Sequence, residues 1–140
     1  MSNINERKTS TDGLRVLSLC GGVETGLYAL QQLGIPVKEY HTYEILPEAI
    51  AVSQYHFPFV VHHGDLYEAD FEQFKGFDLL LCGSCCQSLS KCRIESKEVN
   101  TGLDGKSKIF FRAVEALRVI QPKYFMFENV IPSSDEDLKT

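Results

Sequence analysis

Two short polar segments carry the residues best suited to covalent chemistry. The first, Gly83-Ser84-Cys85-Cys86-Gln87, follows the apolar run FDLLLC, and the second, Glu128-Asn129-Val130, ends the apolar run YFMF. A cysteine in a glycine- and serine-containing loop at a strand end lies among oriented backbone dipoles, which lower the thiol pKa and create a nucleophile. A carboxylate beside it can act as an acid or hold a substrate ring by a hydrogen bond. The alternative is a buried, inert thiol, which is common for free cysteines.

A glycine-containing loop near the N-terminus is suited to binding a nucleoside cofactor. It reads CGGVETG over residues 20–26, between a β-rich run and a segment with helical spacing. Glycines let a ligand approach the backbone, and a helix start offers unpaired N–H groups. Glu44 ends the next expected strand, where a carboxylate accepts both hydroxyls of a ribose. These features fit nicotinamide dinucleotides and S-adenosylmethionine equally, and a tight turn beside an exposed glutamate remains an alternative. Asp65, after the third expected strand, could accept a hydrogen bond from an adenine amino group, or it could simply form a turn.

Five cysteines are present, and four of them lie between Cys82 and Cys92. Cys82 and Cys85 form a Cys-x-x-Cys pattern, which fits a zinc ligand pair or a redox pair. The sequence has no second such pattern and no histidine pair at zinc-finger spacing. The histidines show no ligand spacing with the cysteines, and we expect them to be surface or packing residues: His41, His56, His62 and His63. We therefore predict reduced thiols and no metal site.

The segments that must position these residues alternate between β-type and α-type patterns. Strands are expected over Arg15–Leu19, Val37–Tyr43, Phe59–His62, Phe77–Cys82 and Tyr124–Phe127, and helices over 25–33, 47–55 and 107–120. This alternation predicts an α/β fold with a doubly wound, mostly parallel, Rossmann-like sheet. Glycine and polar residues follow four of the five strands, so they should meet at the carboxyl edge of the sheet, where ligands bind.

Length and composition limit the possible classes of protein. The 140 residues suffice for one domain, with 44% hydrophobic and 24% charged residues, which are globular values. Residues 1–13 are expected to be a disordered lead-in, and the domain covers 14–140. A polar start without an apolar stretch predicts no signal peptide and no secretion, and no run is long enough to span a membrane. We therefore expect a cytoplasmic protein, or a nuclear one in a eukaryote.

The charge is unevenly distributed. The net charge is −5, which argues against a simple nucleic-acid-binding module, yet seven of the 14 basic residues lie between Lys91 and Arg118. This basic segment fits either a solvated loop and helix face or a surface that contacts phosphate.

In chain order, these motifs resemble the DNA cytosine-5 methyltransferase family. LSLCGGVETG is similar to the first cofactor motif of that family, with Cys20 where phenylalanine is usual. Gly83-Ser84-Cys85-Cys86-Gln87 resembles the family's Gly-Ser-Pro-Cys-Gln, with Cys85 in place of proline. Residues 102–111, GLDGKSKIFF, resemble the stretch that follows the catalytic loop, and Phe127–Val130 matches the Glu-Asn-Val motif.

The resemblance implies methyl transfer from S-adenosylmethionine to C5 of cytosine in double-stranded DNA, through a covalent adduct with Cys86. The implied catalytic residues are Cys86, Gln87, Glu128 and Asn129. The implied cofactor residues are Cys20, Gly22, Gly26, Glu44, Asp65, Leu66 and Ser107. The loop from Lys91 to Lys108 would close over a flipped base and contact phosphates. No membrane partner is implied.

The resemblance extends from Val16 to the C-terminus, but the family's Arg-rich motif, target-recognition region and closing helix have no counterpart. We therefore expect the N-terminal part of a catalytic domain, incomplete at its C-terminus. It is either a subunit completed by a second chain that carries the target-recognition region, or a truncated product. Two alternatives are an inactive remnant that binds cofactor or a partner, and a dinucleotide oxidoreductase, against which Cys86 and Glu128 argue. The strand over 124–127 should lie at an open edge of the sheet.

Overall fold

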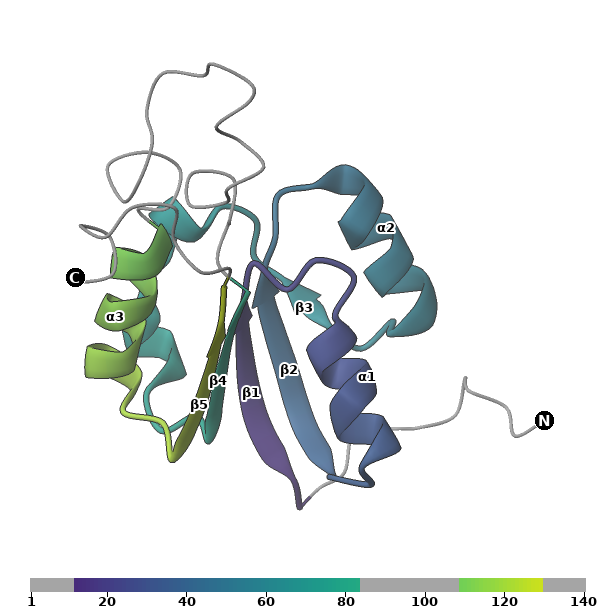
Figure 1. Ribbon diagram of the computed structural model, residues 1–140, viewed down its shortest axis with the longest axis horizontal. Helices are drawn as coiled ribbons and strands as arrows, with labels where there is room; N and C mark the ends of the chain where they lie inside the picture. The colour runs from purple at the N-terminus through teal and green to yellow at the C-terminus, as the bar shows by residue number, and fades with distance from the viewer. Residues whose placement is uncertain (1–11, 84–108, 130–140) are drawn as a thin grey trace.

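A computed structural model describes residues 12–83 and 109–129 of the chain, and it contains one parallel sheet with helices on both faces (Figure 1). The strands run in the order β3-β2-β1-β4-β5, and every neighbouring pair is parallel. The strands are β1 (Leu14–Leu19), β2 (Val37–Tyr43), β3 (Val61–His62), β4 (Leu79–Gly83) and β5 (Tyr124–Glu128). The helices are α1 (Thr25–Gln32), α2 (Pro47–His56) and α3 (Ile109–Ile120), with 3₁₀ turns η2 (Leu66–Glu68) and η3 (Phe71–Phe74). The predicted fold class is confirmed.

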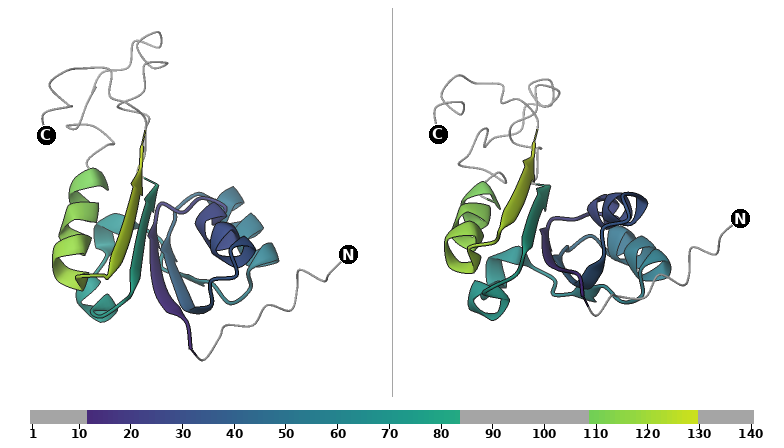
Figure 2. Two further views of the ribbon diagram at one scale, coloured as in Figure 1. Left: turned by 60° about the horizontal axis from the view of Figure 1, so that its bottom comes forward. Right: turned by 90° about the horizontal axis from the view of Figure 1, so that it is seen from below.

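The helices divide between the two faces of the sheet (Figure 2). Helices α1 and α2 cover one face, and α3 covers the other together with η2 and η3. Each face has its own buried apolar cluster. The α1–α2 face holds Val16, Leu27 and Leu81, among others, and the α3 face holds Leu17, Leu80 and Ala116. Because successive strand residues point to opposite faces, Val16 and Leu17 of β1 belong to different clusters.

The predicted elements agree with the structure within a few residues at their ends. Gly34 ends the α1 segment with φ +70°, a conformation that glycine adopts without strain, and Pro47 begins α2. β3 is shorter than expected and covers only Val61–His62. The start of the helix expected at residue 107 lies outside the described residues, and α3 is described from Ile109.

The two 3₁₀ turns were not predicted. Each begins with an aspartate whose side chain accepts a hydrogen bond from a backbone N–H two residues later. Asp65 accepts from Tyr67 at 2.9 Å, and Asp70 accepts from Glu72 at 3.0 Å. These contacts are Asx turns, which local periodicity does not reveal.

β5 lies at the edge of the sheet, as expected, and it pairs with β4 alone within the described part of the chain. Its side chains are exposed, including Tyr124, Phe125 and Met126. Among residues 12–83 and 109–129, no helix is long and apolar enough to cross a membrane.

Candidate functional site

The carboxyl ends of the five strands bring several of the predicted site residues that the structure describes into one row, at the upper end of the sheet in Figure 1. In spatial order the row contains Asp65 after β3, Glu44 after β2, Gly22 after β1, Gly83 at the end of β4 and Glu128 at the end of β5. Parallel pairing alone dictates this arrangement, because each strand points the same way.

A cavity of about 180 Å³ lies toward the β5 end of this row, between the ends of β1, β4 and β5. Cys20, Gly26 and Glu128 line it, so the structure brings two predicted cofactor residues and one predicted catalytic residue together. Two glycines allow the chain to pack closely around the cavity. A Cβ on Gly26 would lie 2.8 Å from Leu81 Cδ1, and one on Gly83 would lie 3.1 Å from the Cys20 carbonyl oxygen. A larger cavity of about 340 Å³ lies between α1 and α2 and contains none of the predicted residues.

Glu44 is nearly buried and connects two loops of the site. Its Oε2 accepts a hydrogen bond from the Gly22 N–H at 2.9 Å. Its Oε1 accepts from the N–H groups of Ile45 and Leu46, at 2.8 and 2.9 Å. A carboxylate has about four acceptor positions, so three backbone donors leave capacity for a ligand hydroxyl. Glu44 therefore shapes the glycine loop in addition to presenting an acceptor.

Asp65 and Leu66 form the adjacent part of the row. Asp65 is exposed and uses Oδ1 to cap η2 through the Tyr67 N–H. Leu66 is buried in the apolar cluster of the α3 face. The turn interpretation of Asp65 is thus correct, and the cofactor interpretation remains a prediction.

Glu24 is a buried acidic residue of the cofactor loop that the sequence patterns did not single out. Its side chain is fully buried, and Tyr40 Oη donates a hydrogen bond to its Oε2 at 2.8 Å. Burial raises the pKa of Glu24, while the hydroxyls of Thr42, Tyr40 and Ser18 and the nearby His62 lower it. The carboxyl group lies directly under Gly21, where a Cβ would come within 2.4 Å of both of its oxygens.

The backbone of Glu24 is as unusual as its environment. Its φ of 63° is in the left-handed region, and its carbonyl accepts the Tyr28 N–H at the start of α1. The Glu24 backbone thus joins the glycine loop to α1, and its side chain joins the loop to Tyr40 of β2. The only sequence signal for this buried position is a bulky charged residue immediately before the helix. The same pattern also fits an exposed helix cap.

The thiols of the site differ in their environments. Cys82 is buried in β4, and burial raises its pKa to about 12, so its thiol stays protonated and unreactive. Cys20 has φ 57° and lines the cavity. The predicted residues Cys86, Gln87 and Ser107, with Cys85 and Cys92, lie outside the described residues. In ranges 12–83 and 109–129, no group of three or more potential ligands could hold a metal ion.

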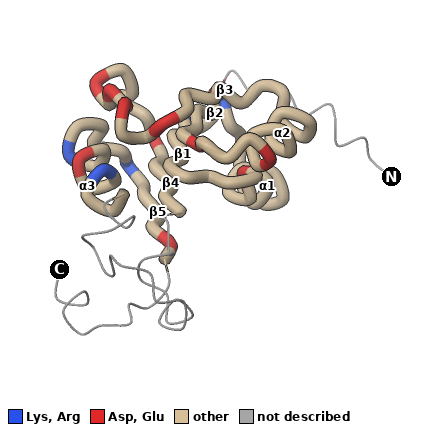
Figure 3. Tube along the Cα trace, turned by 90° about the horizontal axis from the view of Figure 1, so that it is seen from above, with Lys and Arg blue, Asp and Glu red and all other residues tan. Residues whose placement is uncertain are grey.

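Among the described residues, the charged side chains along this edge are mainly acidic (Figure 3). The described part of the predicted basic segment contains Arg112 and Arg118 of α3. Arg118 is exposed, but the Arg112 guanidinium is hydrogen-bonded to the Leu66 and Ala69 carbonyls and is paired with Glu115. The proposed contact with phosphate therefore does not extend to Arg112.

The fold resembles that of known methyltransferases. The crystal structure of Schizosaccharomyces pombe Dnmt2 methyltransferase matches 90% of this chain with a TM-score of 0.66 at 22% sequence identity. The chain covers 38% of that structure. This likeness shows that the chain has a Rossmann-like fold.

Sequence comparison identifies the family. Residues 14–137 match the C-5 cytosine-specific DNA methylase family, and the chain belongs to it. Similar curated proteins include the orphan methyltransferase M.Rho11sI of Bacillus phage rho11s, 32% identical over 124 residues, or 84% of this chain. M.SPRI of Bacillus phage SPR is 33% identical over 119 residues, also 84% of this chain. The type II methyltransferase M.NlaIV of Neisseria lactamica is 30% identical over 110 residues, or 78% of this chain.

The chain spans about a quarter of the length of these curated relatives: 23% of M.Rho11sI, 26% of M.SPRI and 25% of M.NlaIV. The family membership predicted from the motifs is therefore confirmed, together with the expectation that the resemblance covers only a part of the family's catalytic unit.

Proposed function

We propose that this chain supplies the cofactor-binding and nucleophile-bearing part of a DNA cytosine-5 methyltransferase. The observation that carries the proposal is the row of Asp65, Glu44, Gly22 and Glu128 along one sheet edge, with a cavity between β1, β4 and β5. A nucleoside cofactor and a target base must meet at one place, and this edge supports both predicted sets of residues.

S-adenosylmethionine would supply an electrophilic methyl group at this edge. Glu44 has acceptor capacity for one ribose hydroxyl, and its bond to the Gly22 N–H fixes the glycine loop beside it. Asp65 presents a carboxylate to an adenine amino group, and the cavity beside Gly26 would take the amino-acid end. Gly26 and Gly83 let α1 and the end of β4 pack closely around the cavity, because a Cβ at either position would press against Leu81 or the Cys20 carbonyl.

The proposed chemistry of the chain's own residues begins with a cytosine flipped out of the duplex. The Cys86 thiolate forms a bond to C6 while Glu128 holds N3, which makes C5 nucleophilic enough to take the methyl group. Removal of the C5 proton by a base then releases the Cys86 thiolate as the S–C6 bond breaks. Glu128 is exposed at the end of β5 and lines the cavity, a position that suits contact with a substrate ring.

The assignment of Cys86 rather than Cys85 rests on the register set by Gly83-Ser84 and Gln87. In any active assembly, we expect Cys86→Ser to abolish methyl transfer and Cys85→Pro to preserve or raise it. A covalent adduct with 5-fluorocytosine DNA that persists in Cys86→Ala would overturn this assignment.

A second candidate function is a binding partner without activity of its own. The observation that favours it is the edge position of β5 with its exposed apolar side chains Tyr124, Phe125 and Met126. An unpaired apolar edge strand pairs with another chain or aggregates. We propose that a second chain carrying the target-recognition region pairs with β5, whose described partner is β4 alone.

Tritiated methyl transfer to duplex DNA tests the proposal, with Cys86→Ala as the blank. The purified chain alone should give no activity above the blank, because base flipping requires contacts on both sides of the duplex. Activity should appear when a copurifying chain with the recognition region is present. Activity of the isolated chain well above the blank would show that no such partner is needed. Absence of activity with the partner present would favour the non-catalytic alternative.

A further inference from the structure

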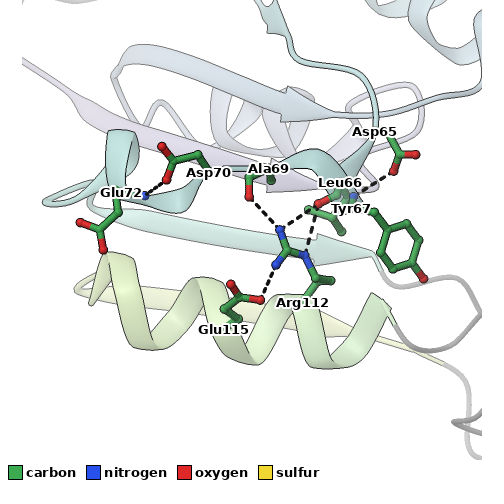
Figure 4. Close-up of polar contacts among 8 residues, drawn as sticks. All are labelled: Asp65, Leu66, Tyr67, Ala69, Asp70, Glu72, Arg112 and Glu115. Carbon is green, nitrogen blue, oxygen red and sulfur yellow. Dashed lines mark hydrogen bonds and ion pairs between the residues drawn. The ribbon is translucent and has the colours of Figure 1, made fainter.

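Arg112 extends from α3 into the interior and not into solvent (Figure 4). Its Nε and Nη2 donate hydrogen bonds to the Leu66 carbonyl oxygen, at 3.3 and 3.2 Å, and Nη2 also donates to the Ala69 carbonyl oxygen at 2.8 Å. Nη1 forms an ion pair with Glu115 one turn further along α3. One side chain therefore connects α3 to two carbonyls of a segment 43 and 46 residues earlier in the chain.

The same guanidinium packs on the aromatic ring that follows this segment. Its Cζ lies 4.8 Å from the centre of the Phe71 ring, within the range of a cation–π contact. Only 19% of the Arg112 side chain is exposed. Arg112 therefore holds the segment from Leu66 to Phe71 at two backbone carbonyls and one aromatic ring.

The segment has little local support of its own. Within η2, the Glu68 and Ala69 N–H groups donate to the Asp65 and Leu66 carbonyls, both at 3.2 Å, and Tyr67 donates to the Asp65 side chain. A 3₁₀ turn of three residues has poor hydrogen-bond geometry and does not persist in isolation. Its position relative to the sheet must therefore come from tertiary contacts, of which Leu66 burial and the Arg112 contacts are the ones observed.

We propose that Arg112 is a positioning residue for the adenine end of the cofactor site, an inference that rests on the function proposed above. Asp65 and Leu66 are the proposed adenine-side residues, and Arg112 fixes the turn that begins with them. α3 begins at Ile109, immediately after the segment 84–108 that contains Cys86. Arg112 thus ties the helix that follows the nucleophile segment to the purine side of the site.

The chemistry requires arginine and not merely a positive charge. A guanidinium is a planar fork with five donors and can serve two carbonyls and a carboxylate together. Lysine supplies a point charge without that fork, so Arg112→Lys should only partly replace it. Arg118, exposed on the same helix, gives a control of equal charge and length.

The experiment compares the full wild-type chain with Arg112→Leu, Arg112→Lys and Arg118→Leu by two measurements. The first is amide hydrogen exchange of the ligand-free protein at residues 67–69, with β1 as the internal reference. The second is the affinity for S-adenosylhomocysteine relative to S-inosylhomocysteine, in which a carbonyl replaces the adenine amino group. This ratio reports purine selectivity and does not change if a variant merely lowers the folded fraction.

We expect Arg112→Leu to increase exchange at residues 67–69 by about tenfold or more without affecting β1, since charge-assisted hydrogen bonds are lost. It should also reduce the adenine preference at least severalfold, Arg112→Lys should be intermediate, and Arg118→Leu should match wild type. Unchanged exchange in Arg112→Leu would overturn the positioning role. Faster exchange with an unchanged adenine preference would overturn the connection to the adenine site. A wild-type chain that binds neither ligand would contradict the proposed function, and the exchange result would still decide whether Arg112 holds the turn.

Discussion

The two faces of the sheet are built from different chemistry. The α1–α2 face buries several residues with polar side-chain groups: Ser18, Glu24, Tyr40, Thr42 and Ser53. The α3 face buries aliphatic and aromatic side chains, and its histidines are stacked: the His41 and His63 rings lie 5.1 Å apart between centroids and share a hydrogen bond of 2.8 Å. Both faces pack beneath the same carboxyl edge of the sheet, and the α1–α2 face places the buried Glu24 carboxyl group beneath it.

This difference indicates that one face mainly stabilises the fold and the other mainly shapes the candidate site. Burying apolar and aromatic surface contributes the larger part of folding free energy, and the α3 face supplies much of it through Phe74 and its neighbours. Buried polar groups contribute little net stability, but they fix the local geometry of the chain because each needs a hydrogen-bond partner in a defined position. On the α1–α2 face, Glu24 and Tyr40 have this role under the glycine loop.

The largest effect should come from the α3 face. Phe74 is 1% exposed and makes edge-to-face contacts with His41, His63 and Phe77, so Phe74→Ala should cost about 3–5 kcal/mol of unfolding free energy. Phe111→Ala, at an exposed position of α3, is the control and should cost under about 1 kcal/mol. Urea denaturation measures both. Equal losses would show that the aromatic cluster does not dominate stability.

A smaller effect is expected on the α1–α2 face. Glu24→Ala leaves the buried Tyr40 hydroxyl without its acceptor, at a cost of about 1–3 kcal/mol. Adding Tyr40→Phe should cost less in the Glu24→Ala background than in wild type, because the two groups are partners. Additive losses in urea denaturation would argue that the hydrogen bond is not formed.

Glu24 also predicts a pH dependence. Burial raises the pKa of Glu24 above its ordinary value of 4.5, so the folded state holds its proton more tightly than the unfolded state. Its contribution to stability is fully present below pH 4.5 and is lost as the pH rises through the higher, folded pKa. The stability of Glu24→Gln relative to wild type should therefore increase with pH over that window. If the difference in unfolding free energy between Glu24→Gln and wild type does not change with pH, the pKa of Glu24 is not raised in the folded protein.

The histidine pair predicts the opposite slope and the smallest effect. Burial lowers the pKa of His41 and His63 below 6.5, and one ring must stay neutral to accept their shared hydrogen bond. This contribution is present above pH 6.5 and is lost as the pH falls through the folded pKa values. His63→Gln should flatten the loss of stability below pH 6.5, whereas His56→Gln, at an exposed position, should leave it unchanged. An equally steep loss in His63→Gln would exclude the pair as its source.

The elements and the row of site residues were predictable because they depend on local patterns and on parallel pairing. Strand ends such as Glu44 and Glu128 are located by hydrophobic runs, and the sheet then aligns them. The sequence could not reveal that Glu44 binds three backbone N–H groups, or that Glu24 turns inward. Arg112 was equally hidden, because a charge on an amphipathic helix fits a solvated face, and its partner carbonyls lie more than 40 residues away.

The central claim is that the carboxyl edge binds the cofactor through Glu44. Isothermal titration of the chain with S-adenosylhomocysteine tests it, with Glu44→Gln as the variant and Glu48→Gln, exposed in the first turn of α2, as the control. A melting curve for each protein confirms that it is folded. We predict binding by wild type and Glu48→Gln, and an affinity at least about tenfold weaker for Glu44→Gln, which loses a charged acceptor for ribose. Equal affinity of Glu44→Gln and wild type, or no binding by folded wild type, would contradict the account.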